Sequence, residues 1–311
     1  MKIFKILFVN IIILFFIFVL CEIYCMTKWY KEFNINCIQR YFDNLFHPRS
    51  VDEYIDYLYS GKYAEESYTS EFRPDENINS NKRPVIFTGC SYTWGDGLAA
   101  TETISSQFAV LTGRPVYNRA GKGWGLDQFL YQSERDDFYN SVKEEPEYIF
   151  YIFIDDHVNR IDKFKTAPFV RDFKPKYKVK NSKLYRQQPN FTDRFYTVEE
   201  FQYNYNYIFK KYDKNRIKLY FNEAEKNIHK RWKNVKIVIL LFPSCKDDGY
   251  YFPELWEELK SENYYNIINI EKLTDEPIYE KQYKVDYAHP SAKVWEIVSP
   301  ELIKKTEYRL I

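Results

Sequence analysis

The sequence predicts an α/β fold in three layers, in which a mainly parallel sheet lies between two layers of helices. Short apolar runs of strand length alternate with longer helix-compatible stretches, which implies parallel strands joined by crossover helices. The run YIFYIFI at 148–154 is apolar without alternation, as expected for a strand that is covered on both faces. A further apolar run at the N-terminus precedes this domain and predicts a membrane anchor.

The N-terminal run comprises residues 6–25, which are apolar apart from Asn10 and Glu22. About 20 apolar residues are needed to span a bilayer as a helix. No small-residue cleavage motif follows, which favours a retained anchor over a cleaved signal peptide. A cleaved peptide, or a lipoprotein modified at Cys21, stays open as an alternative. Lysines ahead of the run favour a cytoplasmic N-terminus, a single pass and an extracytoplasmic soluble domain.

The remaining chain divides by composition into an extension and a domain. We expect an anchor at 1–25, a polar linker or extension at 26–82, and one domain at 83–311, with an insertion or lid at about 161–197. The expected strands lie at 84–89, 116–118, 148–154, 236–242 and 265–270, and the expected helical stretches at 103–111, 127–141 and 198–233.

Composition excludes several classes of function. Lys and Arg number 45 against 44 for Asp and Glu, so the net charge of +1 offers no general field for nucleic acid. The five cysteines show no CxxC pair and no zinc-ligand spacing, and we therefore expect no metal and no cofactor. One disulfide among Cys37, Cys90 and Cys245 stays open.

Ser91 is the first candidate for chemistry. In the stretch FTGCSYTWGDGL it directly follows a predicted strand. Ligands of open α/β sheets bind beyond the carboxyl ends of the strands, where a serine is presented to substrate. An isolated serine at this place is also a common helix cap.

Two further motifs supply what a serine nucleophile needs. Asp286 and His289, in VDYAHPSAKVWEIV, provide a base and an acceptor that orients it from one loop. A surface loop without function explains that pair, taken alone, equally well. The Gly-rich turn in VYNRAGKGWGLDQ offers backbone N–H groups to a developing oxyanion. It lacks the G-x-G-x-x-G spacing of a dinucleotide site.

In their order and separation, these three motifs resemble those of the SGNH (GDSL-type) serine hydrolases. The resemblance implies a flavodoxin-like three-layer sheet. It also implies that Ser91 is the nucleophile, that His289 is the general base and that Asp286 orients it. The N–H groups of Ser91 and Gly123 are implied as oxyanion donors.

The third motif of the family is altered in this chain. Where these hydrolases carry an Asn that donates to the oxyanion, this chain has Asp155, and an ionised carboxylate there would repel an oxyanion. Either Asp155 is protonated, or His157 or Asn159 supplies the third donor, or the hole has two donors. A salt-bridged strand end, with Arg160 pairing Asp155 or Asp156, is the structural alternative.

The resemblance covers roughly residues 84–300 and implies ester hydrolysis through an acyl-enzyme on Ser91. Cys90 replaces the Asp that usually precedes the nucleophile, and we expect this to alter loop packing rather than chemistry. An extracytoplasmic domain with many aromatic residues suits an O-acylated carbohydrate of the cell envelope. An O-acyltransferase of surface glycans that uses the same triad, and a non-catalytic binding protein on this fold, are the alternatives.

Overall fold

A computed structural model describes residues 2–30, 73–162, 175–187, 214–242, 266–278, 280–286 and 288–307, and the single residues Phe195, Val198, Phe201 and Glu257. Its strands are β1 (Val85–Gly89), β2 (Val116–Asn118), β3 (Tyr148–Phe153), β4 (Lys176–Lys180), β5 (Lys183–Gln187), β6 (Lys236–Leu241) and β7 (Asn266–Asn269). Its α-helices are α1 (Lys2–Tyr30), α4 (Ser91–Trp94), α5 (Ile104–Thr112), α6 (Leu126–Ser133), α7 (Asp136–Asn140), α8 (Asp156–Asp162), α11 (Lys214–Arg231) and α13 (Ala292–Glu307). Short 3₁₀ turns are η1 (Ala100–Glu102), η3 (Ile270–Leu273) and η4 (Lys281–Tyr283).

The main sheet has the strand order β2-β1-β3-β6-β7, and each adjacent pair is parallel. This is the flavodoxin-like order, in which the chain changes direction across the sheet between β1 and β3. The prediction of a mainly parallel three-layer α/β fold is therefore confirmed. The loops that follow β1 and β3 lie side by side at the carboxyl edge, where such folds bind their ligands.

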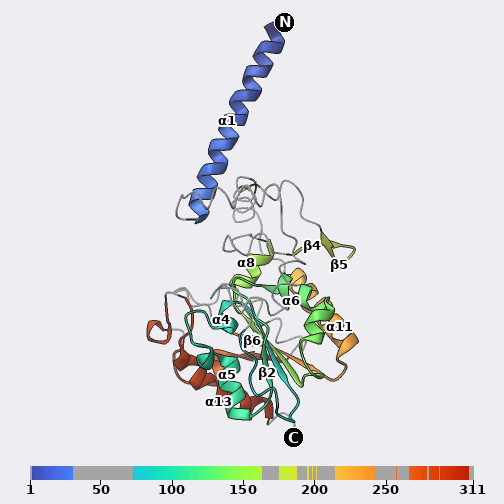
Figure 1. Cartoon of the computed structure of the whole chain (residues 1–311), viewed down its shortest axis with the longest axis vertical. Helices are drawn as coiled ribbons and strands as arrows, with labels where there is room; N and C mark the ends of the chain where they lie inside the picture. Colours follow the sequence, from blue (N-terminus) through green and yellow to red (C-terminus); the bar gives the residue numbers. More distant parts are fainter. Residues whose placement is uncertain are drawn as a thin grey trace.

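The sheet divides the core into two apolar clusters. Figure 1 shows α6 and α11 on one side of the sheet and α5 and α13 on the other. Ile86, Ile149 and Tyr151 pack with α6 and α11 on one face. Phe87 and Phe150, whose positions in the strands alternate with those residues, pack with α5 and α13 on the other. Side chains of successive strand residues point to opposite faces, which explains why β3 is apolar throughout.

The five strands predicted for the main sheet are all present, but the helices differ in detail. The helical stretch expected at 127–141 is divided into α6 and α7, because Arg135 adopts an extended conformation with φ −105° and ψ 135°. The stretch expected at 198–233 contains α11 in its second half. Most of its first half, most of the expected linker, and both Cys37 and Cys245 lie outside the described residues. Cys90 is a free, buried thiol.

The predicted insertion at 161–197 contains an antiparallel hairpin, β4 and β5, that the sequence reasoning missed. Its two-residue turn consists of Asn181 and Ser182, which both have positive φ (50° and 55°). Such a turn matches the twist of the flanking strands. In the sequence, the Asn-Ser pair between KYKVK and KLYRQ was the signal that could have indicated this turn.

Helix α1 is the one helix within the described ranges that is long and apolar enough to cross a membrane, over Ile6–Cys25 (Figure 1). Most of the large apolar side chains of this span are exposed. A signal sequence has the same length and composition. At the other end of the extension, residues 73–82 contact the domain: Glu76 forms an antiparallel bridge with Val116 beside β2, and Asp75 pairs with Arg119 at 2.7 Å.

Candidate active site

Ser91 begins α4 immediately beyond the carboxyl end of β1. The turn between them requires glycine at position 89, where φ is +140°. A Cβ there would lie 2.6 Å from Thr93 Oγ1 and 2.8 Å from the Ile152 carbonyl oxygen of β3. The absence of a side chain at Gly89 thus lets the chain turn tightly and brings Ser91 to the edge of the sheet.

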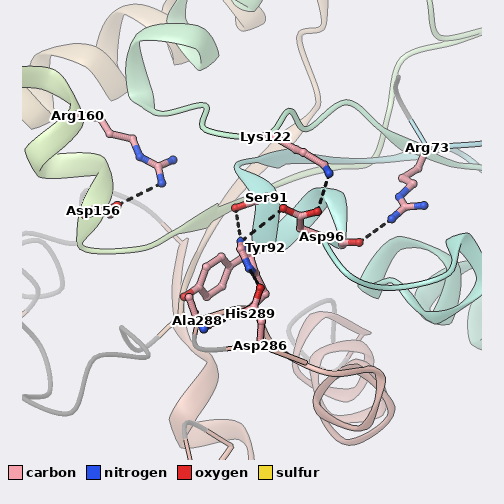
Figure 2. A network of polar contacts seen from close by, with 11 residues as sticks. Arg73, Ser91, Tyr92, Asp96, Lys122, Asp156, Arg160, Asp286, Ala288 and His289 are labelled. Carbon is pink, nitrogen blue, oxygen red and sulfur yellow. Dashed lines mark hydrogen bonds and ion pairs between the residues drawn. The ribbon is translucent and has the colours of Figure 1, made fainter. Parts of the chain in front are cut away.

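The structure brings Ser91, His289 and Asp286 into one hydrogen-bonded series (Figure 2). Ser91 Oγ and His289 Nε2 are 2.9 Å apart, although 198 positions separate them in the sequence. On the other side of the imidazole ring, Nδ1 lies 2.8 Å from Asp286 Oδ2. This is the arrangement in which a histidine removes a proton from a serine while a carboxylate fixes its orientation.

The loop that carries Asp286 and His289 is held by its own backbone. Asp286 Oδ1 accepts hydrogen bonds from the N–H groups of Ala288 and His289, both at 2.7 Å. The Val285 N–H donates to the His289 carbonyl oxygen at 3.0 Å. From α4, the Tyr92 hydroxyl donates to the Ala288 carbonyl oxygen at 2.8 Å, which ties the loop to the helix that begins with Ser91.

These hydrogen bonds set the charge of Asp286. Desolvation is the largest effect and raises its pKa, but the N–H groups of His289 and Ala288 and the imidazole of His289 together lower it further, so the pKa lies below its usual value. Asp286 is therefore ionised at neutral pH and accepts the Nδ1 proton of His289. Nε2 of the neutral ring is then left without a proton and faces the Ser91 hydroxyl.

The Gly-rich segment after β2 forms a turn beside α4. The Gly121 N–H donates to the Gly89 carbonyl oxygen and the Trp124 N–H to the Gly121 carbonyl oxygen, each at 3.2 Å, and Gly123 has φ +74°. Within the part of the chain that the structure describes, neither the Ser91 N–H nor the Gly123 N–H donates to another protein group.

Asn118, the first residue of this segment, has a side chain that holds neighbouring segments together. Its amide nitrogen donates to the Thr93 carbonyl oxygen and to Ser105 Oγ, both at 2.9 Å, and its side-chain oxygen accepts from the Ala120 N–H at 3.2 Å. The side chain is 1% exposed, so these hydrogen bonds fully engage it. Asn118 therefore joins the Gly-rich turn to the helix that carries Ser91.

The altered third motif follows β3. Asp155 is buried, and its backbone carbonyl accepts from the Val158 N–H at 3.0 Å as α8 begins. Asp156 and Arg160 form an ion pair at 3.3 Å, which agrees with the salt-bridged alternative for this stretch. The side chain of Asn159 lies outside the described part of the molecule.

His157 lies in the core. Its Nδ1 is 2.9 Å from the Tyr151 hydroxyl, and its ring packs edge-on against Phe153. Desolvation, with a smaller contribution from the nearby Arg160 charge, lowers the pKa of His157 well below its usual value. The structure thus gives this histidine a neutral, buried position among residues of the α6 and α11 face, and does not join it to Ser91.

An ion pair beside the triad was missed by sequence reasoning. Asp96 Oδ2 lies 3.9 Å from His289 Nε2, and Asp96 Oδ1 lies 2.6 Å from Lys122 Nζ (Figure 2). The Trp94 ring has the Arg73 guanidinium 3.8 Å and the Lys122 ammonium 4.2 Å from its centroid. Arg73 also donates to three carbonyl oxygens of the loop that carries Asp96. A carboxylate is thereby held close to the nitrogen of His289 that faces Ser91.

The described side chains do not form a metal centre: no group of three His, Cys, Asp or Glu side chains among them is arranged to hold an ion. The acidic side chains near Ser91 are instead paired with His289, Lys122 or Arg160.

No family model and no curated protein matches this chain. Solved structures similar to it include a family two carbohydrate esterase from Clostridium thermocellum in complex with cellohexaose (TM-score 0.44, 10% identity, 74% of this chain, 65% of that chain). An acetyl xylan esterase from Butyrivibrio proteoclasticus (0.41, 12%, 74% and 65%) and a protein described as a GDSL-like lipase from Parabacteroides merdae (0.43, 12%, 72% and 95%) are also similar. The chain spans 65% of the length of both carbohydrate esterases.

The geometry of this chain itself identifies its fold. Its parallel sheet has the flavodoxin-like order, Ser91 follows β1, the Gly-rich turn follows β2, and Asp286 and His289 precede α13. The chain accordingly has the three-layer α/β/α fold that the resemblance to SGNH hydrolases implies.

Proposed function

We propose that this protein is a serine ester hydrolase that acts through an acyl-enzyme on Ser91. The observation that carries the proposal is the series of hydrogen bonds from Ser91 Oγ through His289 to Asp286, at 2.9 and 2.8 Å. An ionised Asp286 keeps Nε2 of His289 ready to accept a proton.

In the acylation step, His289 Nε2 takes the proton of the Ser91 hydroxyl as Oγ attacks the carbonyl carbon of the ester. The carbonyl oxygen becomes an oxyanion, which the N–H groups of Ser91 and Gly123 stabilise. The bond to the alcohol then breaks, and His289 returns the proton to the leaving oxygen. The products of this step are the free alcohol and an acyl group esterified to Ser91.

Water completes the cycle by the same groups. His289 takes a proton from a water molecule whose oxygen attacks the acyl carbon, and the oxyanion forms again between the two N–H groups. The bond to Ser91 Oγ breaks, and the proton on His289 passes to Oγ. A carboxylic acid leaves, and Ser91 and His289 regain their starting states.

For the substrate we propose an O-acylated carbohydrate of the cell envelope, with the domain held at the membrane by α1. The apolar span Ile6–Cys25 and the frequency of Tyr and Phe in the chain support this proposal. Carbohydrate esters are also the substrates that the names of the similar esterases indicate. Resistance of the protein to carbonate extraction, and an intact N-terminus by mass spectrometry, would support a retained anchor.

The Ser91→Ala variant tests the reaction. We expect hydrolysis of p-nitrophenyl acetate by the full chain in detergent to fall by about 10⁴–10⁶-fold, because the nucleophile is lost. Ser133→Ala is the matched control, since Ser133 is also buried but donates to the Leu130 carbonyl oxygen at the far end of α6. An unchanged rate in Ser91→Ala would exclude the proposal.

Two further measurements separate hydrolysis from the other functions. A fluorophosphonate probe should label the wild-type chain and not Ser91→Ala. A folded wild-type chain that resists labelling would favour a non-catalytic binding protein.

The second measurement compares hydrolysis with acyl transfer. With an acetylated xylan oligosaccharide as donor and unmodified oligosaccharide as acceptor, free acetate should be the main product. Predominant transfer to the acceptor would instead indicate an acyltransferase.

A further inference from the structure

Arg160 is a buried cation beside the proposed oxyanion site. Its side chain is 11% exposed, and its Nη2 pairs with Asp156 at 3.3 Å. Its Nη1 donates to the Trp124 carbonyl oxygen. Its charge also acts on the Cys90 thiol, where it opposes the effect of desolvation on the pKa. The residue thus interacts with the segments that follow β1, β2 and β3.

Two of these contacts lie next to the proposed oxyanion donors. Cys90 directly precedes Ser91, and Trp124 directly follows Gly123. Trp124 also closes the turn in which Gly123 has its positive φ. We infer that Arg160 is a positioning residue, which holds the Gly123 amide in the geometry of the oxyanion hole through the carbonyl oxygen of Trp124.

Two partners of Arg160 hold its guanidinium from two directions. The Asp156 carboxylate pairs with Nη2, and the Trp124 carbonyl oxygen accepts a hydrogen bond from Nη1. Desolvation dominates at Cys90 and raises the pKa of the thiol despite the opposing effect of the Arg160 charge.

The packing of the backbone around Arg160 supports a positioning role. A Cβ added at Gly125 would lie 3.4 Å from Arg160 Cβ and 3.5 Å from its Cδ, so the arginine stem packs closely against the segment after Trp124. Donors that are fixed before reaction lower the barrier more than donors that must be ordered during it. A change at Arg160 should therefore affect kcat more than KM.

This inference rests on the proposed function and is tested in the full chain with p-nitrophenyl acetate. We expect Arg160→Met to lower kcat by about 10²–10³-fold with KM changed by less than about threefold, as for the loss of an oxyanion donor. Arg160→Lys keeps the charge but loses the planar fork, and should retain an intermediate kcat. Added ethylguanidinium should partly restore the kcat of Arg160→Ala.

Arg135→Met is the matched control. Arg135 is also largely buried, at 16% exposure, and pairs with Asp137 at 2.7 Å, but it lies beyond the C-terminal end of α6. We expect Arg135→Met to lower the thermal unfolding temperature but to keep kcat within about threefold. The reason is that the loss of an ion pair far from Ser91 affects the stability of the fold and not the reaction.

The outcomes separate the inference from the function. If the wild-type chain shows no Ser91-dependent hydrolysis, the proposed function is wrong and the role of Arg160 falls with it. If hydrolysis depends on Ser91 but a folded Arg160→Met or Arg160→Lys keeps the wild-type kcat, only the inference is overturned. Should Arg160→Met fail to fold, Arg160→Lys and its rate of fluorophosphonate labelling provide the test, and a wild-type labelling rate would overturn the inference.

Discussion

The two sides of the candidate site are built in different ways. The Asp286 side is a short loop in which a carboxylate, 40% exposed, binds amides two and three residues further along the chain. On the other side of the site, the Arg160 side chain is 11% exposed. It interacts with Trp124 and Cys90, which lie 36 and 70 positions away in the sequence. Local hydrogen bonds thus organise one side, whereas packing of distant segments organises the other.

This difference predicts different responses to substitution. Loss of a group in the Asp286 loop should remove chemistry and leave the fold almost intact, because few buried contacts depend on it. Loss of a group on the Arg160 side should affect stability and rate together, since an unpaired buried group is costly. Variants on each side therefore test whether the two sides respond differently.

The largest effect among these is expected for Asp286→Asn. The amide would no longer hold the proton on His289 Nδ1, so Nε2 would lose its role as a base, and kcat should fall by about 10⁴-fold. Thermal unfolding at pH 7 should change little. A loss of kcat below about tenfold, or complete unfolding, would show that the two sides are not built as differently as we infer.

Gly123→Ala should have the next largest effect. Its φ of +74° disfavours any residue with a Cβ, so the turn should shift the Gly123 amide and lower kcat by about 10²–10³-fold. The matched control is Gly113→Ala at the end of α5, where φ is +64° and a Cβ would meet only Lys82 Nζ at 3.7 Å. Equal losses of kcat in both variants would argue against Gly123 as a donor.

The smallest effect concerns stability and pH. Because the pKa of Asp286 is lower in the folded chain than in the unfolded one, its ionisation stabilises the fold above about pH 4, and this contribution is lost as pH falls through the folded pKa. The difference in free energy of unfolding between wild type and Asp286→Asn should be level from about pH 7 to pH 5 and shrink towards pH 3. Urea denaturation of the full chain in detergent measures it. A difference that grows on acidification would contradict the assignment.

Much of the fold followed from local patterns. Apolar runs predicted all five strands of the main sheet, since a strand buried on both faces leaves that signature at any place in a chain. The hairpin β4–β5 escaped because its strands are polar and largely exposed, so only the Asn181-Ser182 turn marked it. The division of α6 from α7 escaped because Arg135 is compatible with a helix by propensity alone.

The candidate site was predictable to the extent that its residues lie in recognisable sequence motifs. Ser91, Asp286 and His289 were named from their motifs, and the structure brings them within hydrogen-bond distance. His157 was named for the third motif but lies against Tyr151 in the core, because the direction of a side chain at the start of α8 depends on its packing.

The sequence by itself determined the alternation of strands and helices, the apolar N-terminal run and the order of the motifs that contain Ser91, Gly123, Asp286 and His289. Only the tertiary structure decided that Asp96 approaches His289 and that Arg160 lies between Cys90 and Trp124. The physical reason is that periodicity and spacing act over a few neighbouring residues, whereas the burial of a charge depends on which distant segments close around it. An ion pair between side chains of loops that follow different strands leaves no recognisable pattern in the local sequence.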